Sequence, residues 1–287
     1  MKLQIRPSDR VSVIGRTGSG KTTLFKALLR YWIYATRKWL PYHIVILDTK
    51  KDGDFDGLGK KFTRLKNLTR LWDEYRILIF EPHEEEMNEE YYNGFFRFLR
   101  TTKEPLLLVI DELASVAKGN KVSYEYELLM KQGRAKNQAI WAGIQNPVYV
   151  PHDFLSQAEH YIVFDLLMDT DREKMAGIVG KGAMISPIDK GGGEYGFYYF
   201  AVRKRGLELV KNDPPLAFPV PPDFDPKIAI KNSREKEDSK MNWKFIWAIL
   251  VLALLMVLTI PLWKIFANWL ATRIPAVTPV AEYVNKT

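Results

Sequence analysis

"VSVIGRTGSGKTTLF", residues 11–25, decides the fold class of this chain. A short aliphatic run leads into a glycine-rich loop, and the segment after the loop, TTLFKALLRYW, has the composition of a helix. The loop satisfies the pattern G-x-x-x-x-G-K-[ST] with Gly15, Arg16, Thr17, Gly18, Ser19, Gly20, Lys21 and Thr22. A strand, this loop and a helix in that order predict a phosphate-binding loop in a P-loop NTPase.

The residue types in this loop suit a nucleotide triphosphate. Its glycines let backbone N–H groups turn inward around the phosphates, and Lys21 would reach the β- and γ-phosphates. The Thr22 hydroxyl would ligate Mg²⁺. We therefore expect ATP and Mg²⁺ as cofactors, with residues 15–22 and the adjoining Thr23 binding the nucleotide.

"LLLVIDE", residues 106–112, supplies the acidic half of the predicted site. An apolar strand would deliver Asp111 to its C-terminal end, beside the phosphates, where Asp111 can hold Mg²⁺ through water. Glu112 is the natural general base for an attacking water. The predicted metal-binding residues are therefore Thr22 and Asp111, and the predicted base is Glu112.

The rest of the first 210 residues predicts an α/β fold with a mostly parallel sheet flanked by helices. Short, almost continuously hydrophobic runs alternate with helical patterns, as expected when both faces of a sheet are covered. The predicted strands are 11–15, 43–48, 76–81, 106–111, 139–145, 161–166 and 197–202, and the predicted helices are 21–38, 88–101, 122–134 and 171–179.

The C-terminal composition predicts a membrane anchor. A proline-rich and charged linker, 211–242, leads into the apolar stretch 243–265, and a short tail, 266–287, follows. The 19 residues from Phe245 to Trp263 carry no charge, and at about 1.5 Å per residue they span roughly 28 Å, close to the hydrocarbon thickness of a bilayer. Lysines and arginines are concentrated before this stretch, which predicts a single-pass protein whose domain 1–210 is cytoplasmic.

Charge and cysteine content limit the partners. The chain of 287 residues has a formal net charge of +8 and a pI near 9.3, which favours nucleic acid or an anionic membrane as partner. Because the chain has no cysteine, disulfides and cysteine-ligated metal sites are excluded.

Four stretches together resemble the HerA/FtsK superfamily of ring-forming, DNA-pumping P-loop ATPases, over about residues 8–205. They are GRTGSGKTT, VILDTKKDGDF (45–55), LLLVIDE and GRAKNQAIWAGIQNP (133–147). The second resembles that family's strand ending in Asp-x-Lys, here Asp48 and Lys50, although such a pair is also what a surface ion pair looks like. By this resemblance Gln145 would sense the γ-phosphate or the attacking water, and Arg134 would be presented to a neighbouring subunit's nucleotide. Arg16, Lys136 or a later arginine are alternatives to Arg134 for that role. Lys21, Glu112, Gln145 and Arg134 are thus the expected catalytic residues.

The resemblance implies a RecA-like core in a homo-oligomeric ring, six subunits by analogy. The chain is similar in its compactness to viral genome-packaging ATPases, above all those of tailless phages with an internal membrane. That likeness implies double-stranded DNA as cargo, a portal, vertex or capsid protein as docking partner, and a host inner membrane or virion internal membrane as location.

Two alternatives stay open. A Zot-like assembly ATPase of filamentous phages also combines a P-loop domain with one membrane helix, but extrudes single-stranded DNA. A membrane-bound NTP-dependent scaffold or switch would touch no DNA, and the basic excess would then serve lipid headgroups. Against the scaffold, basic clusters also lie within the core, at 59–70 and 117–121, where they could grip backbone phosphates.

Overall fold

The structure, a computed structural model, describes residues 5–35, 43–118 and 121–212. The chain divides into two compact units, Met1–Lys231 and Asn232–Thr287, and every described residue belongs to the first. The predicted membrane segment 243–265, the tail 266–287 and nearly all of the predicted linker 211–242 lie outside the described residues. Within the part that is described, no helix has the length and apolar character needed to cross a membrane.

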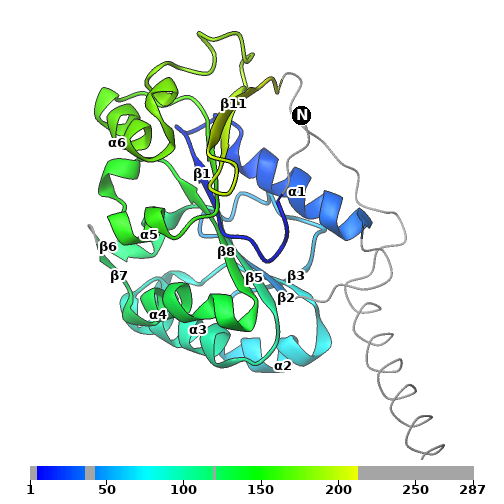
Figure 1. Cartoon of the computed structure of the whole chain (residues 1–287). Helices are drawn as coiled ribbons and strands as arrows, with labels where there is room; N and C mark the ends of the chain where they lie inside the picture. The colour runs from blue at the N-terminus through cyan, green and yellow to red at the C-terminus, as the bar shows by residue number, and fades with distance from the viewer. Residues whose placement is uncertain (1–4, 36–42, 119–120, 213–287) are drawn as a thin grey trace, which may run out of the picture. The chain divides into compact units, whose positions relative to one another are not determined.

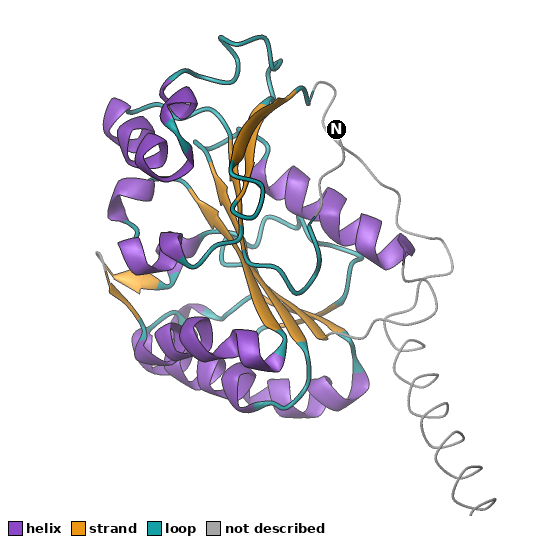
Figure 2. Cartoon of the chain, in the orientation of Figure 1, coloured by secondary structure: helices purple, strands orange, loops and turns teal. Residues whose placement is uncertain are grey.

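A nine-stranded sheet, in the order β11-β10-β9-β1-β8-β5-β2-β4-β3, forms the centre of the described unit (Figures 1 and 2). From β9 to β3 all neighbours are parallel, whereas β10 pairs antiparallel with both β9 and β11. The strands are β1 (Val11–Ile14), β2 (His43–Leu47), β3 (Lys60–Phe62), β4 (Ile77–Phe80), β5 (Leu106–Ile110), β8 (Gln138–Ile144), β9 (His160–Val163), β10 (Phe197–Ala201) and β11 (Gly206–Val210). A separate hairpin pairs β6 (Ala117–Lys118) with β7 (Lys121–Val122).

Helices cover both faces of this sheet (Figure 2). They are α1 (Lys21–Ala35), α2 (Leu68–Glu74), α3 (Glu89–Thr101), α4 (Tyr124–Gln132), α5 (His152–Ser156) and α6 (Asp169–Val179). Alternate residues of β5 show the two layers: Leu106, Leu108 and Ile110 belong to the core that contains α3 and α4, and Leu107 and Val109 to the core that contains α1. This double coverage explains why the strands are hydrophobic throughout.

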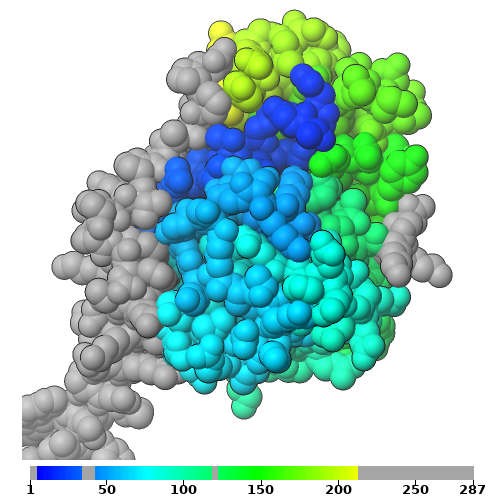
Figure 3. Space-filling view, turned by 180° about the vertical axis from the view of Figure 1, so that it is seen from behind, coloured from blue at the N-terminus to red at the C-terminus, as the bar shows by residue number. Residues whose placement is uncertain are grey.

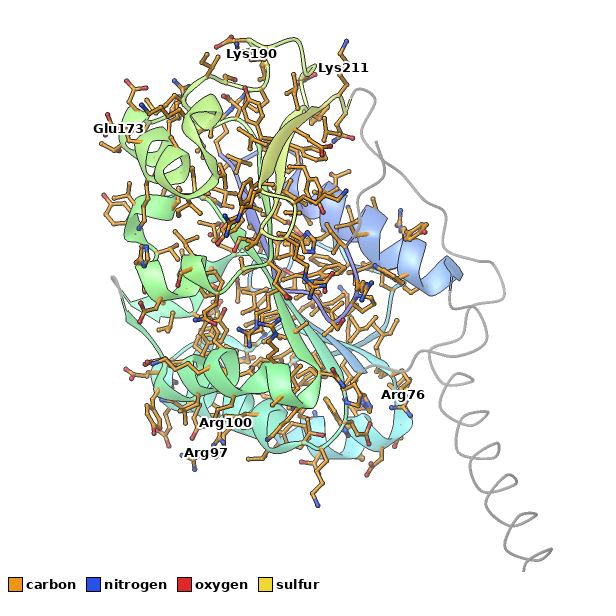
Figure 4. All side chains as sticks on the ribbon, viewed as in Figure 1. Arg76, Arg97, Arg100, Glu173, Lys190 and Lys211 are labelled. Atoms are coloured by element: carbon orange, nitrogen blue, oxygen red, sulfur yellow. The ribbon has the colours of Figure 1, made fainter. Side chains whose placement is uncertain are left out.

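Helices α3 and α4 pack side by side on one face, and two ion pairs to the buried Glu125 connect them. Arg97 and Arg100 of α3, labelled in Figure 4, lie 3.0 and 2.8 Å from the two carboxylate oxygens of Glu125 at the start of α4. Seen from the opposite side, the N-terminal segment and α1 border the segment that follows β2 (Figure 3).

The α/β class, the mostly parallel sheet and all seven predicted strands are confirmed, with ends that differ by at most one residue except at β9, which ends three residues earlier than predicted. The predicted helix 122–134 is longer than the observed helix α4. Residues 121–122 form a strand of the hairpin, and Gly133–Lys136 form a 3₁₀ turn. Prediction also missed β3 and β11, which lie at the two edges of the sheet, and the short helices α2 and α5. Helix α1 is described as far as Ala35, so residues 36–38 of the predicted helix lie outside the described part.

Because the central strands are parallel, their C-terminal ends all lie on the same side of the sheet, which we call its carboxyl edge. The segments that follow β1, β2, β5 and β8 contain the phosphate loop, Asp48 and Lys50, Asp111 and Glu112, and Gln145. In open α/β sheets, ligands bind outside this carboxyl edge.

Candidate nucleotide-binding site

The phosphate loop between β1 and α1 is tied to the strands on both sides of β1. The Gly15 N–H donates to the carbonyl of Ile144, at the end of β8, over 3.0 Å, and the Arg16 N–H donates to the carbonyl of Asp165, just beyond β9, also over 3.0 Å. The Arg16 side chain adds a 2.9 Å ion pair with the Asp165 carboxylate. The loop is thus held to the sheet at its first two residues.

The three glycines of the motif are required by geometry. Gly18 and Gly20 have φ values of +77° and +100°, a region that side chains disfavour. A Cβ at Gly15 would lie 2.6 Å from both the Phe164 Cβ and the Ser19 hydroxyl. The backbone can therefore turn its N–H groups inward, as a phosphate cradle requires.

Lys21, the first residue of α1, lies across this cradle. Its ammonium donates to the carbonyls of Gly15 (2.7 Å) and Arg16 (3.0 Å), and the residue is 5% exposed. Burial lowers the pKa of Lys21 to about 8, against the opposing charge of Glu112. Next along the helix, Thr22 points to the acidic strand end, whereas Thr23 is exposed.

Thr22 and Asp111, the two predicted metal-binding residues, lie in hydrogen-bond contact. The Thr22 hydroxyl donates to Asp111 Oδ1 over 2.7 Å, and the Asp111 side chain is 2% exposed. Hydroxyl and carboxylate oxygens are the hard ligands that Mg²⁺ prefers. Among the described residues no group of three or more acidic or histidine side chains is able to hold a metal, and Mg²⁺ is ordinarily held by few protein ligands together with substrate phosphates. The pair therefore fits Mg²⁺ bound with a nucleotide.

Glu112 lies beside this pair as a buried carboxylate. Burial raises the pKa of Glu112, and the charges of Lys21 and Lys50 oppose the rise. Both carboxylate oxygens are buried and accept no well-formed hydrogen bond in the described structure, although the Gln145 side chain lies close enough to lower the pKa slightly. Such a group suits a general base that takes a proton from water.

Gln145 follows β8 and reaches the phosphate loop. The Thr17 hydroxyl donates to the Gln145 side-chain oxygen over 3.0 Å. One side chain thus contacts the loop and lies near Glu112. This position suits the predicted role of sensing the γ-phosphate or the attacking water.

Arg134 lies far from the phosphate loop of its own subunit. It belongs to the 3₁₀ turn Gly133–Lys136, which precedes the central strand β8. Arg134 therefore lies at the N-terminal ends of the parallel strands, whereas the phosphate loop lies at their C-terminal ends. The seven residues of β8 span about 23 Å at the usual rise per residue. The Arg134 side chain is 73% exposed and lies 3.4 Å from Glu159. The structure does not bring Arg134 into this site.

Lys50 lies within the site, although the sequence did not predict it as a site residue. Asp48 and Lys50 do not form a surface ion pair through their side chains: Asp48 is 1% exposed and accepts the backbone N–H groups of Lys50 and Lys51. The Lys50 ammonium instead lies 2.6 Å from Asp111 Oδ2. The signal that the sequence offered for Lys50 was its position three residues beyond the buried strand β2.

Gly143 and Asp165 were missed altogether. A Cβ at Gly143 in β8 would lie 2.0 Å from the carbonyl oxygen of Asp111, so only glycine permits this approach of β5. Asp165 receives Arg16 on one oxygen and the Ser186 hydroxyl (2.7 Å) on the other. An Asp soon after the apolar run YIVF was the available signal for Asp165.

A glycine cradle, a buried lysine and a Thr–Asp pair at the carboxyl edge of a mostly parallel sheet define a P-loop NTPase site. No protein-family model matches the sequence, and no curated protein shows significant similarity to it.

Solved structures resemble the chain in fold. The genome-packaging NTPase B204 of Sulfolobus turreted icosahedral virus 2, in complex with ATP-gammaS, matches with a TM-score of 0.60 at 17% identity, over 74% of this chain and 100% of that chain. The DNA-packaging ATPase B204 of Sulfolobus turreted icosahedral virus matches with a TM-score of 0.59, at the same identity and coverage. The chain therefore has the fold of these viral packaging ATPases, which confirms the predicted resemblance to viral genome-packaging ATPases at the level of the fold.

Proposed function

We propose that this chain is a membrane-anchored, ATP-driven motor that pumps double-stranded DNA, as a viral genome-packaging ATPase does. The observation that carries the proposal is the buried Glu112 carboxylate beside the Thr22–Asp111 pair and the Lys21 cradle. Binding a nucleotide needs only the cradle, whereas a buried base next to it serves hydrolysis. The similar structures are those of packaging enzymes, which supports DNA as the cargo.

The hydrolysis step uses the residues in the roles that their positions allow. A water oxygen bonds to the γ-phosphorus while the bond from that phosphorus to the β–γ bridging oxygen breaks, and the electron pair stays on ADP. Glu112 accepts the proton of the water. Lys21 and the loop N–H groups stabilise the charge on the phosphate oxygens. Thr22 and Asp111 would hold Mg²⁺, which supplies further positive charge to the β- and γ-phosphates.

A ring of subunits completes the site. Arg134 is exposed at the N-terminal ends of the parallel strands. It would enter the nucleotide site of a neighbouring subunit and stabilise transition-state charge there. Each hydrolysis event would then depend on the subunit contact. Six subunits are proposed by analogy with the HerA/FtsK family.

The hairpin β6–β7 offers a route from hydrolysis to DNA. It follows Glu112 after one 3₁₀ turn, in which the Ser115 hydroxyl donates to the Glu112 carbonyl over 2.7 Å. Its sequence, AKGNKV, contains two lysines, the residue type that binds backbone phosphates. A conformational change at Glu112 would therefore be transmitted to the lysine-containing hairpin β6–β7 through only a few residues.

The C-terminal segment would anchor the motor. We propose that 243–265 crosses a host inner membrane or a virion internal membrane once, with the ATPase domain on the cytoplasmic side and a portal, vertex or capsid protein as docking partner. The lack of charge over a bilayer-length stretch and the preceding lysines and arginines support this.

ATP turnover of the full-length protein tests the proposal, measured without DNA, with linear duplex and with circular single strands. Lys21→Ala serves as the blank. We expect stimulation by the duplex and none in the blank. Stimulation by single strands alone would instead favour a Zot-like extrusion ATPase, and turnover indifferent to both DNAs would favour an NTPase scaffold or switch.

A further inference from the structure

The turn after β2 aims Lys50 at the metal-binding carboxylate. The Asp48 N–H donates to the Phe80 carbonyl over 2.9 Å, which continues the ladder between β2 and β4. Asp48 Oδ1 then accepts the N–H groups of Lys50 (3.1 Å) and Lys51 (3.0 Å), while Lys51 adopts a left-handed φ of +57°. A buried carboxylate thus fixes the turn on which Lys50 is carried.

Both oxygens of Asp111 are engaged in the structure. Oδ1 accepts the Thr22 hydroxyl, and Oδ2 lies 2.6 Å from the Lys50 ammonium. The Asp111 side chain is 2% exposed and that of Lys50 is 34% exposed, so the carboxylate is fixed and the lysine has solvent on one side. Lys50 and Mg²⁺ are both cations directed at the same carboxylate.

Lys50 is also close to the reacting end of the site. Its charge acts on Lys21, which reaches for the phosphates, and on Glu112, the proposed base. Lysine has a compact ammonium on a flexible four-carbon stem, so it can change partner without movement of the backbone. An ammonium released from Asp111 therefore remains near the γ-phosphate position.

We propose that Lys50 is a second catalytic lysine, which neutralises Asp111 in the nucleotide-free protein, releases it when Mg²⁺ and ATP bind, and then contacts the γ-phosphate. This inference rests on the proposed function. It makes two predictions of opposite sign for removal of the Lys50 charge. Mg²⁺ loses a competitor and should bind at lower concentration, whereas hydrolysis loses a cation at the transferred phosphoryl group and should slow.

The test compares full-length wild type with Lys50→Met, which keeps length and removes charge, and Lys50→Arg, which keeps charge. Lys51→Met is the matched control, because it removes a neighbouring exposed charge in the same turn. A fluorescent, non-hydrolysable ATP analogue reports binding during a Mg²⁺ titration, and ATP turnover at saturating Mg²⁺ gives kcat. Thermal unfolding checks that each variant is folded.

We expect Lys50→Met to lower the half-saturating Mg²⁺ concentration by at least about threefold and kcat by about 100-fold, a loss typical of one charge-stabilising donor. Lys50→Arg should keep the wild-type Mg²⁺ requirement, and Lys51→Met should match wild type in both readouts. An unchanged kcat in Lys50→Met would overturn the catalytic role. A raised Mg²⁺ requirement would overturn the exchange and show that Lys50 only positions Asp111.

The outcomes separate this inference from the proposed function. If wild type and Lys51→Met bind and hydrolyse ATP while Lys50→Met is indistinguishable from them, only the role of Lys50 fails. If wild type binds no Mg²⁺–nucleotide, both fail. If Lys50→Met does not fold, Lys50→Arg decides, because a γ-phosphate contact tolerates a change in cation geometry poorly and its kcat should still fall.

Discussion

Lys21 and Glu112 are buried in one region, where each charge alters the other. Burial lowers the pKa of Lys21 and raises the pKa of Glu112, and the two groups partly offset these shifts by their mutual attraction. Shifts in these directions bring a lysine and a carboxyl closer to neutral pH, as acid–base and phosphate-binding groups require. At the scale of residues, the site is a set of coupled charges.

Nucleotide affinity should fall at alkaline pH because of Lys21. The protonated lysine binds phosphate, and its pKa in the free protein is about 8. Affinity should therefore be constant below pH 8 and fall by about tenfold per pH unit above it, as expected for one linked proton. The dissociation constant of an ATP analogue, measured from pH 6.5 to 9.5, checks this.

Lys21→Arg is the matched control for that titration. Its guanidinium stays charged over the whole range, so any affinity that remains should not fall above pH 8. Wild-type affinity that is flat to pH 9.5 would contradict the account of Lys21. An equal fall in Lys21→Arg would assign the effect to another group.

At the scale of elements, β5 and β8 have to approach closely to place Asp111. Gly143→Ala would put a Cβ 2.0 Å from the Asp111 carbonyl oxygen, a backbone atom that cannot give way cheaply. We expect a loss of about 1–3 kcal/mol in the free energy of unfolding, as for overpacked core positions, together with weaker Mg²⁺–nucleotide binding. Denaturant unfolding and analogue binding measure the two effects.

Gly177→Ala provides a control of the same chemistry. Gly177 lies in α6, and a Cβ there meets nothing within 4 Å. This change should stabilise the protein by about 0.5–1 kcal/mol, since alanine is the better helix former. Equal effects of the two substitutions would show that the approach of β5 and β8 does not control the site.

The second prediction at the scale of elements concerns the 3₁₀ turn Gly133–Lys136, which precedes β8. Arg134→Ala should abolish most hydrolysis while nucleotide binding stays at the wild-type level, because Arg134 lies outside its own subunit's site. Rings mixed from Arg134→Ala and Lys21→Ala subunits should regain turnover, since an intact arginine can then meet an intact phosphate loop. Mixed rings without any recovery would contradict action between subunits.

Sequence patterns were sufficient for elements with strong periodicity or motif chemistry. The phosphate loop, the strand before Asp111 and the strand before Gln145 were predicted because buried parallel strands are hydrophobic throughout and end in polar residues. The edge strands β3 and β11 were missed because their exposure leaves a mixed sequence, such as KKF in β3. The Lys50–Asp111 pair joins residues 61 positions apart, and only the register of β2 against β5 reveals it.

At the scale of the whole molecule, the features of the chain are those expected of the proposed membrane-anchored motor. In the proposed motor, hydrolysis would depend on a neighbouring subunit through the exposed Arg134 and would act on DNA through the hairpin β6–β7 that follows Glu112. The net charge of +8 supports binding to a polyanion. The proposed membrane segment 243–265 would hold such a ring where DNA has to pass.

DNA movement itself is the most direct test of the central claim. Full-length protein would be supplied with linear duplex DNA that carries a bound third strand, and release of that strand would be followed on addition of Mg²⁺ and ATP. We predict ATP-dependent release by wild type, and none by Glu112→Gln, which should bind ATP without hydrolysing it. Duplex-stimulated ATP turnover without release of the third strand would contradict a translocating motor.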